Sequence, residues 1–205
     1  MVRVKICGIT NLADAQAAVK AGADALGFVF AKSPRRVSEH EARRIASAIG
    51  PWIAKVGVFV NSSPAVVEGV MRRCGLDVAQ LHGDEAPAAA RSLRSKGLRV
   101  VKALRVGPAT DLRAYRNYPA DAFLLDTASP QAYGGTGKSF DWQILKQARF
   151  SKPVIVSGGL RPENVGALLK VYTPYGVDVS SGVEKTPGKK DPKAVKAFIK
   201  NAKTF

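Results

Sequence analysis

Cys7 is the first residue along the chain whose type and position favour chemistry. It follows residues 2–6, whose alternation is typical of a short strand, and it precedes Gly8, where the chain can turn tightly. A thiol at the last inward position of a first strand is well placed to meet a substrate. Most free cysteines are small buried hydrophobes, so the assignment of Cys7 to a functional site depends on the rest of the chain.

Asp126 is the second such residue, because it ends the apolar run 123–125. Aspartate is unfavourable in a strand, and its place there favours a role in a site over packing. The alternative is a helix N-cap, but the next helical pattern begins near Asp141, too far along the chain for Asp126 to cap it. We expect partial burial to raise the pKa of Asp126 and to make it a proton donor.

Two glycine-containing turns, each after a β-rich run near the end of the chain, are candidates for anion binding. They are Ser157-Gly158-Gly159 and Ser180-Ser181-Gly182. Glycine lets backbone N–H groups approach an anion closely, and loops after the last two strands of a (β/α)8 barrel commonly bind phosphate. Ordinary tight turns are the alternative, but the presence of both turns in the last two units favours phosphate binding.

Arg35 and the run 133–139 add further polar side chains. The planar fork of Arg35 suits a carboxylate, although either Arg35 or its neighbour Arg36 could equally be surface charge. Residues 133–139 resemble a P-loop, but Ala132 stands where that motif needs glycine. We interpret this run as a flap over the site, in which Lys138 could contact an anion.

The composition narrows the classes of partner. The 32 Lys and Arg against 16 Asp and Glu give a formal net charge of +16, which suits nucleic acid, an acidic surface or an anionic small substrate. The basic residues are spread over predicted helix surfaces without interleaved aromatic residues, so we expect no nucleic-acid binding. No apolar run approaches the roughly 20 residues that span a bilayer, and no signal peptide is apparent, so we expect a reducing cytoplasm.

Histidine and cysteine are too few and too scattered for a metal site or a disulfide. The two cysteines, Cys7 and Cys74, lie far apart in the sequence and have no metal-ligand spacing. His82 lies near a strand end, where a lone histidine is more often a hydrogen-bonded structural residue than a catalyst. We therefore expect no metal.

A repeated unit positions these residues: a short β-rich run, a loop with a polar or glycine tip, and an amphipathic helix. Helical patterns include one that starts at the capping box of Ser38 and Glu41, and Pro162 and Pro192 lie where further helices would begin. Alternating strands and helices imply a parallel sheet. The eight β-rich runs are 2–6, 25–30, 55–60, 78–81, 99–103, 122–126, 154–157 and 176–180.

Eight units favour a fold of the α/β class, a single (β/α)8 or TIM barrel with short loops, over an open doubly wound sheet. An open sheet would carry a nucleotide-binding fingerprint after its first strand, and Cys7-Gly8-Ile9-Thr10 is not one. We expect one domain over residues 1–205, although the length does not exclude two small domains. In a barrel, function gathers at the C-terminal ends of the strands, where the candidate residues lie.

The period-two alternation of strands allows a finer prediction. Lys5 shares the inward face with Cys7, and Asp178 lies on one face of the last strand. A buried Lys5 needs a partner, so we expect Asp178 to pair with it. We also expect the charge of Lys5 to help Cys7 to reach its thiolate form.

Seven motifs together are specific, and the resemblance that they carry runs over residues 2–191, essentially the whole chain. They are Lys5-Ile6-Cys7-Gly8-Ile9-Thr10, Gly27-Phe28-Val29-Phe30, Val56-Gly57-Val58-Phe59, Gln80-Leu81-His82-Gly83, Leu125-Asp126 with the run 134–138, Ser157-Gly158-Gly159-Leu160 with Pro162-Glu163-Asn164, and Asp178-Val179-Ser180-Ser181-Gly182-Val183-Glu184. These motifs resemble those of the phosphoribosylanthranilate isomerase family.

The resemblance implies a (β/α)8 isomerase of tryptophan biosynthesis that needs no metal or organic cofactor. Such an enzyme converts N-(5′-phosphoribosyl)anthranilate into 1-(o-carboxyphenylamino)-1-deoxyribulose 5-phosphate by an Amadori rearrangement. By motif, Asp126 would be the general acid that protonates the ring oxygen, and Cys7 the general base that removes the C2′ proton. The partner implied is a small phosphosugar, without nucleic acid or membrane, and the chain would be a monomer or a homodimer.

The resemblance also assigns the groups that would bind substrate. Arg35 would hold the anthranilate carboxylate. The other implied substrate-binding residues are Gln80, His82 and Asp178, and the implied phosphate-binding residues are Gly158, Gly159, Ser180, Ser181 and Gly182.

The second rim loop departs from the pattern of the family. Arg36 stands where relatives usually have an aromatic residue, and residues 31–34 lack the usual Tyr-Pro, so stacking on the anthranilate ring is expected to differ.

Two other functions compete with this interpretation. The histidine-pathway sugar isomerase is the nearest rival, but it has an aspartate in place of Cys7 and a clearer twofold repeat. A catalytically silent, basic phosphate- or nucleic-acid-binding protein is the rival from another class, and Cys7 and Asp126 count against it.

Overall fold

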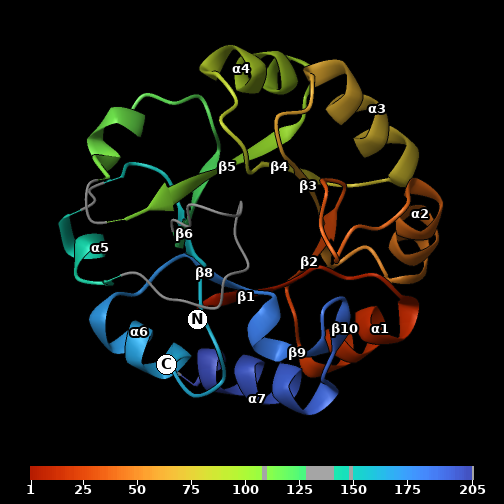
Figure 1. The fold of residues 1–205 in the computed structure, drawn as a ribbon, viewed down its shortest axis with the longest axis vertical. Helices are drawn as coiled ribbons and strands as arrows, with labels where there is room; N and C mark the ends of the chain where they lie inside the picture. The colour runs from red at the N-terminus through yellow and green to blue at the C-terminus, as the bar shows by residue number, and fades with distance from the viewer. Residues whose placement is uncertain (108–109, 128–140, 148–149, 205) are drawn as a thin grey trace.

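The chain folds into a closed barrel of eight parallel strands in the computed structural model, which describes residues 1–107, 110–127, 141–147 and 150–204. Neighbouring strands pair in chain order, and β8 pairs with β1 to close the ring (Figure 1). This confirms the predicted (β/α)8 barrel. The strands are β1 (Arg3–Cys7), β2 (Ala25–Val29), β3 (Ala54–Phe59), β4 (Val78–Leu81), β5 (Arg99–Val106), β6 (Ala122–Thr127), β7 (Val154–Val156) and β8 (Gly176–Val179).

Helices surround the barrel, and a short hairpin follows its last strand (Figure 1). The α-helices are α1 (Leu12–Ala21), α2 (Glu39–Ala48), α3 (Pro64–Cys74), α4 (Pro87–Ser95), α5 (Ile144–Gln147), α6 (Val165–Val171) and α7 (Pro192–Lys203), with 3-10 turns η1 (Leu112–Tyr115) and η2 (Ser181–Val183). The hairpin consists of β9 (Glu184–Thr186) and β10 (Lys189–Lys190). No helix of the described residues is long and apolar enough to cross a membrane.

Local sequence signals explain where most of these elements begin. The Ser38 hydroxyl caps α2 by accepting from the backbone N–H of Glu41 at 3.2 Å, as the capping box predicts. Pro192 begins α7, as predicted. Pro162 lies instead in the turn before α6, because Asn164, whose side chain accepts from the backbone N–H of Arg161, precedes the first helical residue.

Strand β5 differs most from its predicted bounds. The prediction ends it at residue 103, whereas it continues to Val106. The extension forms because Leu104, Arg105 and Val106 pair with Leu125, Asp126 and Thr127 of β6. The longer strand supports Asp126 from one side.

The inside of the barrel has an apolar half and a polar half. Val101, Ala103, Ala122 and Leu124 form a cluster inside the ring, packed against Val78 and Ile155. Nearer the C-terminal ends of the strands, the buried interior is polar. The residues there are Lys5, Cys7, Gln80, Asp126 and Asp178. Buried polar side chains near the C-terminal ends of the strands are what an active site of a barrel needs.

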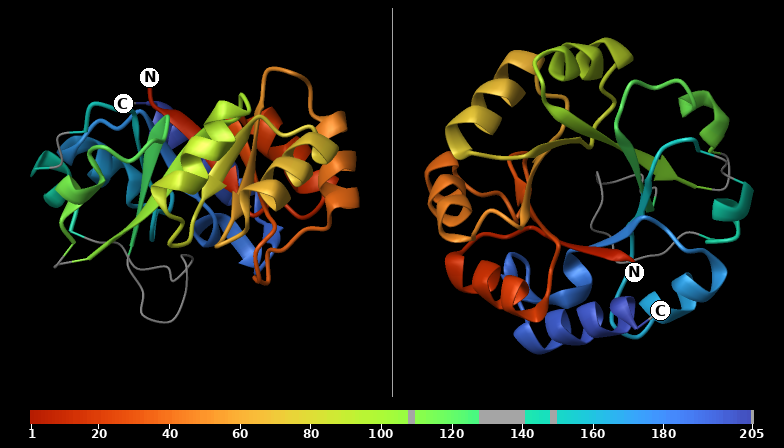
Figure 2. Two further views of the ribbon diagram at one scale, coloured as in Figure 1. Left: turned by 90° about the horizontal axis from the view of Figure 1, so that it is seen from above. Right: turned by 180° about the vertical axis from the view of Figure 1, so that it is seen from behind.

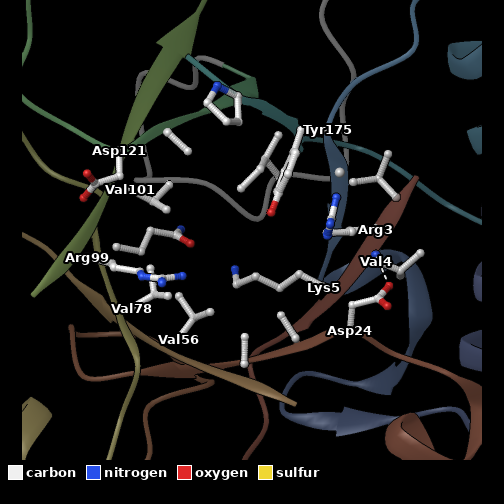
Figure 3. A pocket seen from close by; sticks show the side chains of 18 of the residues that line it. Arg3, Val4, Lys5, Asp24, Val56, Val78, Arg99, Val101, Asp121 and Tyr175 are labelled. Atoms are coloured by element: carbon white, nitrogen blue, oxygen red, sulfur yellow. Dashed lines mark hydrogen bonds between the residues drawn. The ribbon is translucent and has the colours of Figure 1, made fainter. Parts of the chain in front are cut away.

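A cavity of about 400 Å³ opens at the N-terminal end of the barrel. Arg99 and Tyr175 point toward its middle, and Lys5 reaches it from the wall (Figure 3). Asp24 and Asp121 lie at its edge, where their carboxylates accept from the backbone N–H groups of strands β1 and β5. This cavity is lined by residues at the strand starts, so it lies at the end of the barrel opposite to Cys7 and Asp126.

Candidate active site

Cys7 ends β1 as a buried thiol at the C-terminal rim, where the strand pattern predicts it. Its sulfur lies over Gly27 of β2, because a Cβ added at Gly27 would stand 2.7 Å from Cys7 Sγ and 3.1 Å from Lys5 Cε. A Cβ atom does not approach another heavy atom as closely as 2.7 Å, so any side chain at position 27 would displace Cys7. Strand β2 therefore needs glycine at this position. The backbone of β2 thus leaves room for the thiol and the lysine together.

Lys5 and Asp178 form the predicted ion pair, with Lys5 Nζ 2.9 Å from Asp178 Oδ1. Ser157 at the end of β7 donates to the other oxygen of Asp178 at 3.2 Å. Burial lowers the pKa of Lys5, but Asp178 and Cys7 outweigh burial and hold that pKa above its ordinary value. Lys5 therefore stays charged beside the thiol.

The pKa of Cys7 lies above its ordinary value. Burial raises it, and Lys5 and Lys190 lower it by a smaller amount. The expectation that Lys5 favours the thiolate is therefore right in direction, while burial determines the net shift. A general base with this pKa needs further positive charge to ionise, such as a cationic intermediate of the substrate.

Asp126 ends the inward face of β6 and is buried, three strands away from β1 around the ring. His82 Nε2 lies 3.1 Å from Asp126 Oδ2, and Gln80 Nε2 lies 2.9 Å from His82 Nδ1. An amide NH₂ can only donate, so His82 Nδ1 accepts and Nε2 carries the hydrogen that it donates to Asp126. The backbone N–H of Thr127 donates to the other carboxylate oxygen at 2.9 Å.

The structure thus brings His82 to Asp126, a contact that the sequence could not show. Gln80 and Asp178, both predicted to bind substrate, are buried and bonded to His82 and Lys5 respectively. Through these contacts Gln80 holds His82 beside Asp126, and Asp178 holds Lys5 near Cys7.

Arg35 reaches the rim from the loop after β2 and forms an ion pair that the sequence did not predict. Its Nε and Nη2 donate to the Glu184 carboxylate at 2.8 to 3.1 Å. Lys190 Nζ donates to the same carboxylate at 2.8 Å. In Figure 2 the loop after β2, drawn in orange, and the blue hairpin lie at the end opposite to both termini.

The two predicted phosphate loops lie at the ends of β7 and β8, as expected. Gly158 and Gly159 both have left-handed backbones, with φ of 87° and 63°, which glycine adopts without strain. A Cβ at Gly158 would collide with Thr127, so this loop packs directly on the strand of Asp126. Asn164 holds the loop by donating to the carbonyl of Gly159 at 2.9 Å.

Ser180, the first residue of the second loop, has an unpaired polar group that faces the turn after Cys7. Its hydroxyl is buried and has no hydrogen-bond partner among the described residues. A Cβ added at Gly8 would stand 3.0 Å from this hydroxyl, so Ser180 lies against the turn that follows Cys7. A buried hydroxyl without a partner is costly, and a bound anion would satisfy it. Ser181 and Gly182 follow in η2.

The predicted flap at 133–139, including Lys138, lies outside the described residues. The ion pairs of Glu184 were missed because its partner Arg35 is far away in sequence and no local pattern connects the two.

Comparison with known proteins gives a consistent result. A model of the N-(5′-phosphoribosyl)anthranilate (PRA) isomerase family matches residues 4–201. An N-(5′-phosphoribosyl)anthranilate isomerase from Rubrobacter xylanophilus is 50% identical over 206 residues, covering 100% of both chains. One from Geobacter sulfurreducens is 50% identical over 204 residues, covering 99% of both chains.

Solved structures of the same kind superpose closely. The phosphoribosyl anthranilate isomerase from Thermotoga maritima has a TM-score of 0.92 and 46% identity, with 100% of both chains covered. Another phosphoribosyl anthranilate isomerase, in complex with reduced 1-(o-carboxyphenylamino)-1-deoxyribulose 5-phosphate, has a TM-score of 0.88 and 44% identity, again with 100% of both chains covered. A third structure holds monomers of the dimeric Thermotoga maritima enzyme, with a TM-score of 0.88, 44% identity and 100% of both chains covered.

Proposed function

The chain belongs to the N-(5′-phosphoribosyl)anthranilate isomerase family, and from this premise we propose that Asp126 is its general acid and Cys7 its general base. The reaction is the Amadori rearrangement of N-(5′-phosphoribosyl)anthranilate to 1-(o-carboxyphenylamino)-1-deoxyribulose 5-phosphate, a step of tryptophan biosynthesis. The observation that carries the assignment is the placement of these two buried groups at one rim, on β1 and β6, each with its own set of polar neighbours.

The acid step opens the furanose ring. Protonated Asp126 gives its proton to the ring oxygen, the C1′–O bond breaks, and the nitrogen lone pair forms an iminium with C1′. The carboxylate that remains is stabilised by the Nε2–H of His82 and the backbone N–H of Thr127, because both already point at its oxygens. The pair of donors therefore favours the product side of this proton transfer.

The base step follows from the charge of the iminium. The Cys7 thiolate removes the C2′ proton, the C2′–H electrons form a C1′–C2′ double bond, and the iminium nitrogen becomes neutral. The resulting enolamine tautomerises to the ketone. Lys5 and the cationic intermediate both favour the thiolate, which offsets the effect of burial on the pKa of Cys7.

The two charged ends of the substrate have separate contacts in this proposal. The phosphate binds to the backbone of Gly158, Gly159, Ser181 and Gly182 and to the unpaired hydroxyl of Ser180. The anthranilate carboxylate binds to Arg35. Anchoring both ends holds C1′ and C2′ between Asp126 and Cys7, and such positioning supplies much of the rate acceleration of an enzyme.

The direct test compares two variants of the proposed pair with one control. Substrate is generated in situ from anthranilate and phosphoribosyl pyrophosphate, and loss of its fluorescence is followed. We expect Cys7→Ala and Asp126→Asn each to lower kcat by about 10²- to 10⁴-fold, with KM nearly unchanged. Cys74→Ala removes the other buried cysteine, which ends α3 and donates to the carbonyl of Glu39 in α2, and it should retain activity. Near-normal turnover in either first variant would remove that residue from the mechanism.

The setting of the enzyme is proposed on the same premise. We place it in the cytoplasm as a monomer or a homodimer that acts on a small phosphosugar and binds no nucleic acid. Because a net charge of +16 favours binding to polyanions, the expected absence of nucleic-acid binding needs a direct test. Sedimentation of the pure protein distinguishes the two oligomeric states, and a filter-binding assay with duplex DNA at physiological salt should detect no complex.

A further inference from the structure

The hairpin that follows β8 lies against two loops of the proposed site. The backbone N–H of Lys190 in β10 donates to Asp14 of α1 at 2.8 Å, and the Thr10 hydroxyl donates to the carbonyl of Gly188. Figure 1 shows β9 and β10 beside α1 and α7, outside the ring of strands. The hairpin is therefore fixed to the turn that begins at Cys7, and its side chains have a defined place at the rim.

A buried cluster of three charges joins this hairpin to Arg35. The Glu184 side chain is 4% exposed, and it accepts from Arg35, from Lys190 Nζ and from the backbone N–H of Gly188. The Lys190 side chain is 1% exposed. Arg35, Lys190 and Glu184 form this cluster, which we call the Glu184 triad, and it has two basic groups for one carboxylate. Burial lowers the pKa of Lys190, and Glu184 opposes that effect. Two basic groups beside one carboxylate favour the entry of one further anion.

The geometry of Arg35 determines where that anion can bind. A guanidinium has five N–H donors, and Glu184 occupies the edge made by Nε and Nη2. The remaining donors belong to Nη1 and to the second hydrogen of Nη2, which together form a second flat edge. A carboxylate fits such an edge with two parallel hydrogen bonds. Glu184 thus fixes the plane of the guanidinium and leaves one edge for a ligand.

Lys190 connects the triad to the phosphate loop. Its Nζ lies 2.8 Å from Glu184 Oε1 and 3.3 Å from the carbonyl of Ser180, whose hydroxyl is unpaired. One ammonium group therefore touches both the support of Arg35 and the turn proposed to hold phosphate. The spacing between the two anion sites depends on this contact.

We propose that Glu184 and Lys190 are positioning residues for the two charged ends of the substrate: Glu184 orients Arg35 toward the carboxylate, and Lys190 sets the distance from Arg35 to the phosphate loop. This inference rests on the proposed function, in which Arg35 receives that carboxylate. The pKa of Glu184 supports it. Burial raises that pKa, but Arg35 and Lys190 outweigh burial and hold it below its ordinary value, so Glu184 is ionised at neutral pH.

A simple anchoring role for the hairpin makes different predictions. If Glu184 only fastens the hairpin, then Glu184→Gln lowers stability and affects every kinetic parameter alike. If it orients Arg35, the substitution raises KM for the substrate by about 10-fold or more, as expected for a lost charge-assisted contact, with kcat within about twofold. Inhibition by inorganic phosphate, which probes only the other anion site, should change little.

The decisive experiment is a double-mutant cycle on KM. In an Arg35→Ala background, we expect Glu184→Gln to change KM by less than about twofold, because its effect passes through Arg35. Lys190→Met should raise both KM and the inhibition constant for phosphate, because Lys190 contacts both parts. Lys185→Ala, on the same hairpin but with an exposed side chain, is the matched control and should leave both constants unchanged.

The outcomes separate this inference from the proposed function. A wild-type protein without isomerase activity contradicts the proposed function. An active wild type in which Glu184→Gln leaves KM unchanged, or raises it equally with and without Arg35, overturns the inference alone. If Glu184→Gln does not fold, Glu184→Asp keeps the charge on a shorter stem, and the same cycle is measured with it.

Discussion

Lys5 is the residue whose charge acts most directly on the proposed base. It lies beside Cys7 over Gly27 and is held by Asp178, so its ammonium group cannot move away from the thiol. Two effects therefore oppose each other at one sulfur: burial raises the pKa of Cys7, and Lys5 lowers it. The balance between them determines the pH range in which Cys7 can accept a proton.

Replacing Lys5 with Met should make this balance visible in the pH dependence. Without the ammonium group the pKa of Cys7 rises further, so a higher pH is needed to form the thiolate. We expect the ascending limb of kcat/KM against pH to move to higher pH in Lys5→Met, with activity recovering on the alkaline side. The rate of alkylation of Cys7 by iodoacetamide should show the same displacement, and an unmoved limb would contradict the role of Lys5.

Several of these residue contacts could be predicted from the sequence, and others could not. The pairing of Lys5 with Asp178 follows from strand periodicity, because inward positions of adjacent strands meet in a closed barrel. Arg35 lies in a loop and Glu184 in a hairpin outside the barrel. Neither segment has the inward and outward alternation of a barrel strand, so their pairing could not be predicted. The contact of His82 with Asp126 depends on a rotamer and a tautomer, which sequence patterns do not specify.

At the scale of elements, the loop between β4 and α4 carries His82 and is fixed by a buried ion pair. Lys102 Nζ of β5 lies 2.7 Å from Glu85 Oε2 and donates to the carbonyl of Gly83 at 2.6 Å. Glu85 accepts from the backbone N–H groups of Asn61 and Gly83. Both side chains are nearly fully buried. This pair determines the path of the loop and therefore the place of His82.

Breaking this pair should be costly because it leaves a buried charge. We expect Lys102→Met to lower the free energy of unfolding by about 3–5 kcal/mol in urea titrations. Lys96→Ala removes an exposed lysine that pairs with Glu68 and should cost less than about 1 kcal/mol. Adding Glu85→Gln to Lys102→Met should recover part of the loss, since no unpaired charge remains. An equal cost for the buried and exposed lysines would contradict this account.

The positions of the elements were easier to predict than their ends. Helix α2 begins at its capping box because a serine hydroxyl and its target N–H are local. Strand β5 is longer than its apolar run indicates, since pairing with β6 extends it to Val106. Pro162 precedes α6 without starting it, because Asn164 binds both Arg161 and Gly159 in the turn. Contacts within a few residues set the starts of α2 and α6, and pairing with a distant strand sets the end of β5.

The whole molecule carries a formal charge of +16, while the substrate carries a phosphate and a carboxylate. A positive electrostatic field accelerates the association of an anionic substrate at low salt, because the Debye length is about 30 Å at 0.01 M. At 0.15 M salt the Debye length falls to about 8 Å, and the surface charges are largely screened. We expect kcat/KM to fall as KCl is raised across this range, while kcat at saturating substrate stays constant. A salt-independent kcat/KM would show that the surface charge does not assist encounter.

The N-terminal cavity has a consequence for how this protein can change over generations. In most barrels of this kind, one end carries stability and the other carries activity, so the two properties vary almost independently. Here Lys5 and Gln80 line the cavity from one side and support Cys7 and Asp126 from the other. Larger side chains at Val56 or Val78 would fill the cavity and contact Lys5 or Gln80. Selection for a higher melting temperature at this end of the barrel would therefore also change the turnover rate.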